Sequence, residues 1–221
     1  MQHETRAVTQ RTTGYPRSLR VHSFLESSSV NGPGQQRAVI WLQGCSIGCP
    51  QCWNPATHLR SAGSKWAVEK ILAWLNLVHS RIEISGLTIS GGEPLEQAPG
   101  LVQLVEDVRG QFPDLSIGLF SGYSETELDR GSYLCFPSAI AVEKRELWRR
   151  TSRTLDFAVL GRYNALAPSS DPMIASRNQR LRLYSSRYSP ADFKPQHVEV
   201  TIDGHGLTQI TGFPVSGAVT E

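Results

Sequence analysis

The chain has 221 residues, a formal net charge of +2 and a hydrophobic fraction of 39%. This length suffices for one globular domain with a sizeable core, and the weak positive charge lacks the strong basic patch typical of a nucleic-acid binder. No apolar run approaches the roughly 20 residues needed to span a bilayer, and residues 1–13 lack the apolar core of a secretory signal. We therefore expect a cytoplasmic protein with no nucleic-acid and no membrane partner, with a flexible tail over residues 1–17 and one domain over residues 18–221.

The apolar pattern predicts strands that alternate with helices. The predicted strands cover residues 19–25, 38–42, 87–90, 115–119 and 155–160. The predicted helices cover residues 68–78, 101–108 (ended by Gly110), a short stretch that begins at the capping box Ser124–Glu127, and 142–152 with Leu147 and Trp148 as apolar anchors. Such alternation favours a parallel sheet with right-handed crossovers. The strands are too few for a closed eight-stranded barrel, which leaves an open, partial (β/α) barrel as the expected fold class.

The last part of the chain carries a different pattern. Residues 198–202 alternate between apolar and polar, residues 203–206 have turn chemistry, and residues 207–210 alternate again. This predicts a C-terminal β-hairpin.

Three of the four cysteines lie within eight positions, directly after the predicted strand 38–42. Cys45, Cys49 and Cys52 have the spacing Cys-x3-Cys-x2-Cys, and thiolates that close in sequence can bind one inorganic centre. Structural zinc sites and electron-transfer clusters usually have four protein ligands. A site with three protein ligands leaves one metal position for a small molecule, and the remaining cysteine, Cys135, reads as a buried thiol in an apolar stretch.

The cysteine spacing and its flanking segments resemble the radical S-adenosylmethionine enzymes, and among them the activating proteins of glycyl-radical enzymes of the anaerobic ribonucleotide reductase type. The resemblance covers roughly residues 19–183. Two departures are a longer chain, with extra sequence at 131–150 and the C-terminal hairpin, and a turn before Arg37 that is one residue longer than usual. The matching segments are Asn-Gly-Pro-Gly at 31–34, Trp-Leu-Gln-Gly at 41–44, Trp-Asn-Pro-Ala-Thr-His at 53–58 and Gly-Leu-Thr-Ile-Ser-Gly-Gly-Glu-Pro-Leu at 86–95.

The resemblance implies that the three cysteines hold a 4Fe–4S cluster and that S-adenosylmethionine chelates the fourth iron. One-electron reduction then gives a 5′-deoxyadenosyl radical that abstracts hydrogen from a substrate, so no catalytic residue is expected beyond the cluster. It also implies a glycyl-radical enzyme as partner and a flavodoxin- or ferredoxin-like electron donor. The residues expected to contact S-adenosylmethionine are Gly91, Gly92, Glu93, Pro94, Ser121, Gly122 and Trp53.

Several of these residues also have simpler interpretations. Gly-Gly-Glu-Pro can be a plain turn, although its expected place at a strand end favours a ligand. Trp53 can pack in the core, and His58 can be a metal ligand. The segments 156–163 and 176–180 also resemble the activating proteins and are expected to face the substrate. The arginines 149, 150 and 153 are better read as a solvated helix face than as a partner surface.

Two alternatives remain for the function. The same radical chemistry can act on a peptide or a small molecule, because fold does not fix function. The chain can also be a non-catalytic zinc or iron–sulfur module for binding or electron transfer, in which case Cys135 or His58 supplies the fourth ligand.

Overall fold

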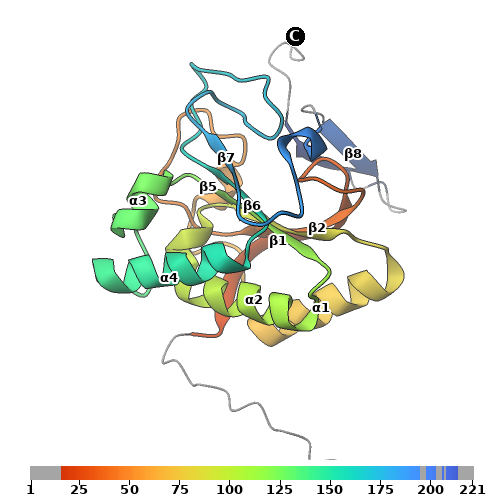
Figure 1. Cartoon of the computed structure of the whole chain (residues 1–221), viewed down its shortest axis with the longest axis horizontal. Helices are drawn as coiled ribbons and strands as arrows, with labels where there is room; N and C mark the ends of the chain where they lie inside the picture. The colour runs from red at the N-terminus through yellow and green to blue at the C-terminus, as the bar shows by residue number, and fades with distance from the viewer. Residues whose placement is uncertain (1–15, 195–197, 203–205, 207, 214–221) are drawn as a thin grey trace, which may run out of the picture.

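A computed structural model describes residues 16–194, 198–202, 206 and 208–213, and Figure 1 shows the arrangement of their helices and strands. The predicted tail therefore lies almost wholly outside the described residues, as do three of the four residues of the predicted hairpin turn. The strands are β1 Ser18–Ser28, β2 Arg37–Leu42, β3 Ser64–Ala67, β4 Gly86–Gly91, β5 Ser116–Ser121, β6 Phe157–Leu160, β7 Arg180–Leu183, β8 Val198–Ile202 and β9 Thr208–Gly212. The α-helices are α1 Val68–Arg81, α2 Ala98–Gln111, α3 Glu125–Arg130 and α4 Ala141–Thr154, and short 3-10 helices are η1 Pro55–Thr57, η2 Pro94–Gln97 and η3 Pro190–Asp192.

The main sheet has seven strands in the order β3-β1-β2-β4-β5-β6-β7. Its centre, from β2 through β4 and β5 to β6, is parallel, while β1, β3 and β7 join antiparallel at the two sides. The edge strands β3 and β7 do not pair with each other, so the sheet is open. This confirms the predicted open α/β class. The sequence reading missed β3 and β7, because four-residue edge strands carry too little pattern to be distinguished from loops.

The helices α1, α2 and α4 lie on one face of the sheet, and the predicted hairpin, now β8 paired with β9, lies on the other side (Figure 1). The continuous apolar run of β2 follows from its central place, since a parallel strand covered on both faces can bury every side chain. Ala38, Val39, Ile40 and Leu42 are all fully buried. None of the described helices is long and apolar enough to cross a membrane.

The predicted helices are all present, and α1, α2 and α4 are longer than predicted by one to three residues at their ends. Helix α2 continues through Gly110 to Gln111, so the prediction that Gly110 ends it was wrong. The capping box at Ser124 is confirmed, because the Ser124 side chain accepts from the Glu127 backbone nitrogen and the Glu127 carboxylate accepts from that of Ser124.

The arginine group on α4 is only partly a solvated face. Arg149 pairs with Glu146 on the same helix, as a surface arginine commonly does. Arg150 instead binds Glu106 of α2 through two hydrogen bonds of 2.8 and 2.6 Å. Arg150 therefore joins two helices.

Candidate iron–sulfur and S-adenosylmethionine site

A cavity of about 510 Å³ opens where the parallel strands end. Carboxyl ends of parallel strands are where ligands collect in open α/β sheets, because the loops that follow them meet there. Nine of the ten predicted cofactor contacts and cluster ligands line this cavity: Cys45, Cys49, Cys52, Trp53, Gly91, Gly92, Glu93, Ser121 and Gly122. Pro94, the remaining one, is buried at the start of η2 and does not line the cavity.

The cysteine loop is closed by backbone hydrogen bonds to the segment that follows it. The Gly44 nitrogen donates to the Thr57 carbonyl at 2.7 Å, and the Cys45 nitrogen donates to the His58 carbonyl at 3.1 Å. Inside the loop Gly48 and Gln51 adopt left-handed backbone angles (φ 58° and 57°), a conformation that is uncommon for a residue with a side chain such as glutamine. These bonds fix the loop and leave the three thiols at the cavity.

Packing of the backbone requires glycine at positions 91 and 92, which the sequence did not reveal. The Gly92 nitrogen donates to the Leu42 carbonyl at 2.8 Å, which joins the end of β4 to the end of β2. A Cβ atom on Gly92 would lie 2.3 Å from the Gly44 carbonyl oxygen, and one on Gly91 would lie 2.4 Å from the Leu42 nitrogen. Glycine is therefore required here for the close approach of two backbones, beside any contact with a ligand.

The carboxylate of Glu93 joins the ends of β4 and β5. It accepts hydrogen bonds from the Leu95 nitrogen (2.9 Å), the Ser121 hydroxyl (2.9 Å) and the Gly122 nitrogen (2.7 Å). The residue is fully buried, and burial raises the pKa of its carboxyl from an ordinary 4.5 to about 7 against the opposing effect of the three donors. Glu93 thus holds Ser121 and Gly122, two other predicted contacts, at the cavity wall.

A second buried carboxylate, Glu96, supports the cysteine loop and was missed at the sequence level. Its oxygens accept from the backbone nitrogen of Ser46 at 2.7 Å and from the Arg60 guanidinium at 2.8 Å. The Arg60 guanidinium in turn stacks on the ring of Phe136, 3.4 Å from its centroid. The only sequence signal was a second acidic residue two positions after Gly-Gly-Glu-Pro.

An aromatic group forms the side of the cavity beyond the cysteines. Trp53 is 42% exposed, and its ring lies 5.1 Å from that of Tyr163 and 6.0 Å from that of Phe213. Tyr163 and Phe213 line the same cavity. Trp53 is therefore a wall residue of the cavity and not a core residue.

Cys135 and His58, the candidate fourth ligands, occupy different places. Cys135 is buried in the main core and does not line the cavity, and burial raises the pKa of its thiol to about 11. This confirms the reading of Cys135 as a buried thiol. His58 does line the cavity, beside the loop.

The donor set of the cavity fits a four-iron cluster. Such a cluster binds each cysteine at a separate iron, and Cys45, Cys49 and Cys52 all line the cavity. The Cys52 sulfur also accepts a hydrogen bond from the Asn54 nitrogen (3.4 Å), and hydrogen bonds to cysteine sulfur tune the potentials of such clusters.

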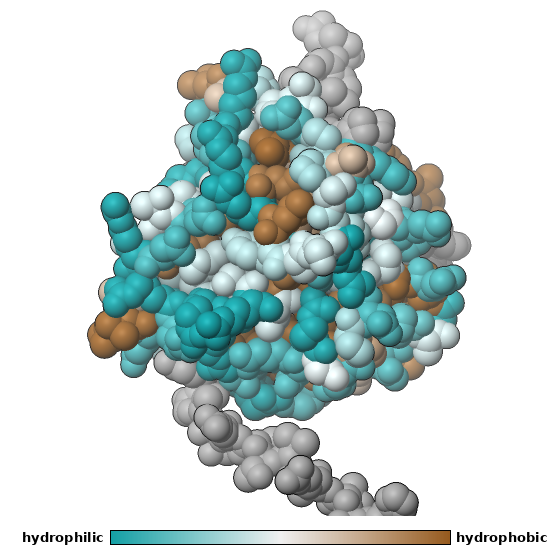
Figure 2. All heavy atoms as spheres, viewed as in Figure 1, coloured by the Kyte–Doolittle hydropathy of each residue, from teal (hydrophilic) through white to brown (hydrophobic). Residues whose placement is uncertain are grey.

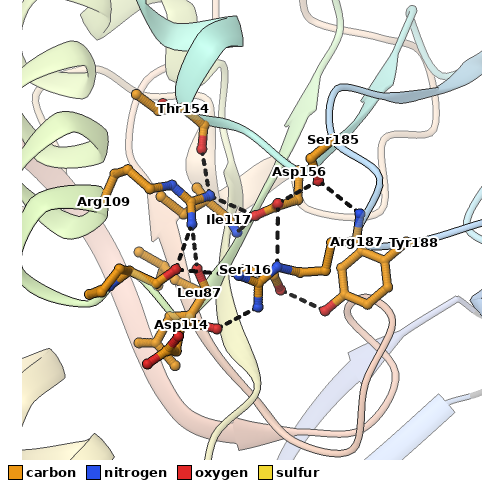
Figure 3. A network of polar contacts seen from close by, with 12 residues as sticks. Leu87, Arg109, Asp114, Ser116, Ile117, Thr154, Asp156, Ser185, Arg187 and Tyr188 are labelled. Atoms are coloured by element: carbon orange, nitrogen blue, oxygen red, sulfur yellow. Dashed lines mark hydrogen bonds and ion pairs between the residues drawn. The ribbon is translucent and has the colours of Figure 1, made fainter.

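The segment 156–163, expected to face the substrate, runs from one end of the sheet to the other. Val159, Gly161 and Tyr163 line the cavity, whereas Asp156 precedes β6 at the opposite end of the sheet. There the Asp156 carboxylate accepts from Arg109 (2.7 Å), the Ile117 nitrogen (2.8 Å) and the Ser185 hydroxyl (2.6 Å), as Figure 3 shows. Asp156 is therefore a structural ion-pair residue.

The segment 176–180 reaches the cavity through Gln179. The Gln179 amide donates to the Gly161 carbonyl at 3.1 Å and accepts from the backbone nitrogens of Ala175 and Ser176. Ser176 itself is fully buried, and its hydroxyl accepts from the Asn164 nitrogen. These contacts fix the loop that carries Tyr163.

Comparison with known proteins agrees with this geometry. A family model described as a 4Fe-4S single cluster domain matches residues 30–182. The anaerobic ribonucleoside-triphosphate reductase-activating protein of Vibrio cholerae is 35% identical over 124 residues, which cover 54% of this chain and 78% of that protein. The protein of the same name from Escherichia coli is 32% identical over 50% of this chain and 73% of its own.

Two further matches are more partial. The pyruvate formate-lyase-activating enzyme of Clostridium pasteurianum is 35% identical over 39% of this chain and 37% of its own length. Among solved structures, QueE from Escherichia coli has 19% identity and a TM-score of 0.39, with coverage of 55% of this chain and 57% of that one.

The open sheet and the three-cysteine cavity at its carboxyl edge define an iron–sulfur protein of the radical S-adenosylmethionine class, with a 4Fe–4S cluster and S-adenosylmethionine as cofactors. The chain belongs to the 4Fe-4S single cluster domain family, in the branch of the anaerobic ribonucleoside-triphosphate reductase-activating proteins.

Proposed function

We propose that this protein installs a radical on a glycine of a large partner enzyme of the anaerobic ribonucleotide reductase type. The observation that carries the proposal is the cavity in which Cys45, Cys49 and Cys52 face Gly91 and Gly92 at neighbouring strand ends. Three cysteine ligands leave one iron of a 4Fe–4S cluster for S-adenosylmethionine. When bound, the reduced cluster and S-adenosylmethionine supply a 5′-deoxyadenosyl radical, which takes a hydrogen atom from the substrate.

In the proposal the residues of this chain bind and orient the two cofactors and shield the reaction. In the proposal Cys45, Cys49 and Cys52 hold the cluster, and the backbone at Gly91–Glu93 and Ser121–Gly122 binds S-adenosylmethionine. Burial raises the pKa of the Cys45 and Cys49 thiols, so both are protonated before iron binds. Each therefore releases a proton when it becomes an iron ligand. The rings of Trp53, Tyr163 and Phe213 form one wall of the cavity, and in the proposal they shield the radical reaction from water.

A partner and an electron donor complete the proposal. The named relatives activate anaerobic ribonucleoside-triphosphate reductase, which supports a glycyl-radical enzyme as the substrate of this chain. The electron required for each turnover comes, in the proposal, from a flavodoxin- or ferredoxin-like protein. We place the reaction in the cytoplasm, because a reducing compartment keeps cysteine ligands as thiols.

The direct test is formation of 5′-deoxyadenosine by the anaerobically reconstituted and chemically reduced protein given S-adenosylmethionine. We expect product from the wild type and none from Cys49→Ala, while Cys135→Ala, outside the cavity, should retain both iron and activity. An intact cluster that gives no product, with or without the partner enzyme, would contradict the proposal.

The same preparation tests the non-catalytic alternative. A four-ligand structural site would need His58 or Cys135 in addition to the three cysteines. Loss of iron in the His58→Ala, Cys135→Ala double variant would support that alternative, and full iron content would exclude it. A peptide or small molecule as substrate remains the second enzymatic reading, and radical transfer to the reductase would decide against it.

A further inference from the structure

The C-terminal hairpin attaches to the body of the protein through its polar face. The Glu199 carboxylate accepts from the backbone nitrogen and the hydroxyl of Ser29, at 3.2 and 3.1 Å. Thr211, which lies opposite Glu199 in the hairpin register, accepts from the Asn31 side-chain amide at 2.8 Å. Since side chains alternate along a strand, the residues between these point to the other face.

That other face is apolar and exposed. Val198, Val200 and Ile202 follow one another at every second position of β8, and Ile210 lies opposite Val200 on β9. Their exposed fractions are 43%, 55%, 66% and 68%. Apolar atoms appear at the upper right edge of the molecule in Figure 2, where Figure 1 places β8.

This arrangement is the reverse of the usual one. A sheet with one solvated face normally buries its apolar side chains and exposes its polar ones, and an isolated two-stranded hairpin is only marginally stable in water. A row of β-branched apolar side chains that faces outward is the pattern of a surface that another protein covers.

The hairpin also forms one side of the cluster cavity. All six consecutive residues from Thr208 to Phe213 line it, together with the three cysteines, so Ile210 belongs both to the apolar face and to the rim of the cavity. The hairpin lies outside residues 30–182, which the family model matches. A protein bound to the apolar face would therefore lie next to the opening of the cavity. It would contact an element outside the domain that the family model matches.

We propose that the apolar face formed by Val198, Val200, Ile202 and Ile210 is the docking surface for the protein substrate. This inference rests on the proposed function, because it requires a protein that presents a backbone segment to the cavity. The four side chains carry no charge, so the complementary surface on the substrate is apolar. Docking beside the rim holds the substrate while its reactive segment enters the cavity.

The test uses the full chain with a reconstituted cluster and, as the probe, an anaerobic ribonucleoside-triphosphate reductase, the enzyme named for the relatives. The variant Val200→Lys, Ile202→Lys places two unpaired charges on the face, and we expect its affinity for the reductase to fall by at least about tenfold. Thr201→Lys, on the opposite face of the same strand, is the matched control and should change affinity less than about twofold. A Val200→Thr, Ile202→Thr variant removes apolar surface while keeping strand propensity, and should weaken binding as well.

The outcomes separate docking from chemistry. Neither Val200 nor Ile202 lines the cavity, so all variants should keep wild-type iron content and partner-free formation of 5′-deoxyadenosine. Undiminished binding of the lysine variant, or no binding of the wild type, would overturn the docking proposal while product formation leaves the proposed function standing. A wild-type dimer that the lysine variant dissociates would assign the face to a second copy and would also overturn it. Absence of product from every protein would instead contradict the proposed function.

Discussion

The carboxylate of Glu96 lies 2.7 Å from the backbone nitrogen of Ser46, inside the loop that carries the three cysteines. Glu96 is fully buried, and its other oxygen pairs with Arg60. The Glu96 carbonyl also accepts from the Phe136 nitrogen at 2.7 Å. One residue of η2 thus connects the cysteine loop to the segment 131–140, whose role the sequence left open.

Replacing Glu96 by alanine should loosen the cysteine loop. The change leaves the Ser46 nitrogen and the Arg60 guanidinium without their acceptor, and we expect a loss of about 2 kcal/mol in the free energy of unfolding. Urea unfolding of the iron-free protein measures this, and iron content after reconstitution should fall in parallel. Glu96→Gln, which keeps an acceptor for Ser46, should recover part of both.

The matched control for this change is Glu69→Ala. Glu69 is exposed and pairs with Arg17 at the surface, and exposed pairs contribute about 0–1 kcal/mol. If Glu96→Ala were no more costly than Glu69→Ala and bound full iron, the supporting role of Glu96 would be wrong.

Two glycine-to-alanine changes should have opposite signs. Gly92→Ala would place a Cβ atom 2.3 Å from the Gly44 carbonyl oxygen, so we expect a loss of about 2 kcal/mol or more and reduced iron binding. Gly110→Ala, in the last turn of α2 with nothing within 4 Å of the added atom, should stabilise by about 0.5–1 kcal/mol. Thermal unfolding of both variants compares them directly, and equal effects would contradict the packing account.

Asp156→Ala should separate stability from cofactor binding. The change removes the charged partner of Arg109, whose guanidinium keeps only backbone carbonyl acceptors such as that of Thr154, and leaves the Ile117 nitrogen without its side-chain acceptor (Figure 3). We expect a loss of about 3 kcal/mol. Because the network lies at the end of the sheet away from the cysteines, the folded variant should still bind a full complement of iron at low temperature. Iron loss without a loss of stability would place Asp156 in the site after all.

The buried carboxyl of Glu93 should make stability depend on pH. Its pKa is about 7 in the folded protein against an ordinary 4.5, so the folded state holds a proton that the unfolded chain has released between these values. The stabilisation from this group is complete below about pH 4.5 and is lost as pH rises through about 7.

The measurement is urea unfolding of the iron-free wild type and of Glu93→Gln between pH 4.5 and 8. The wild type should lose stability relative to the variant across this range, because glutamine does not titrate there. Curves that stay parallel would show that the Glu93 carboxyl keeps an ordinary pKa in the fold.

The local patterns of the sequence were enough for the central fold. Strands such as 38–42 and 155–160 and helices such as 68–78 were predicted because hydrophobic periodicity follows from burial of one face or of both. The capping box at Ser124 was readable for a similar reason, since it is formed within four residues. The antiparallel edge strands β3 and β7 were not predicted, because a short edge strand is decided by the neighbour it pairs with and not by its own pattern.

The sequence by itself also determined which motifs the site contains: three cysteines at Cys-x3-Cys-x2-Cys spacing after a strand, and Gly-Gly-Glu-Pro after the next parallel strand. The tertiary structure decided what the supporting residues do. Glu96 and Arg60 are 36 positions apart, and Asp156 and Arg109 are 47 apart, so no local pattern could connect them. The hairpin was visible as alternation, but which of its faces points outward depends on the contacts of Glu199 and Thr211 with the loop after β1. Long-range packing fixes such choices, because a side chain's surroundings are set by segments distant in the chain.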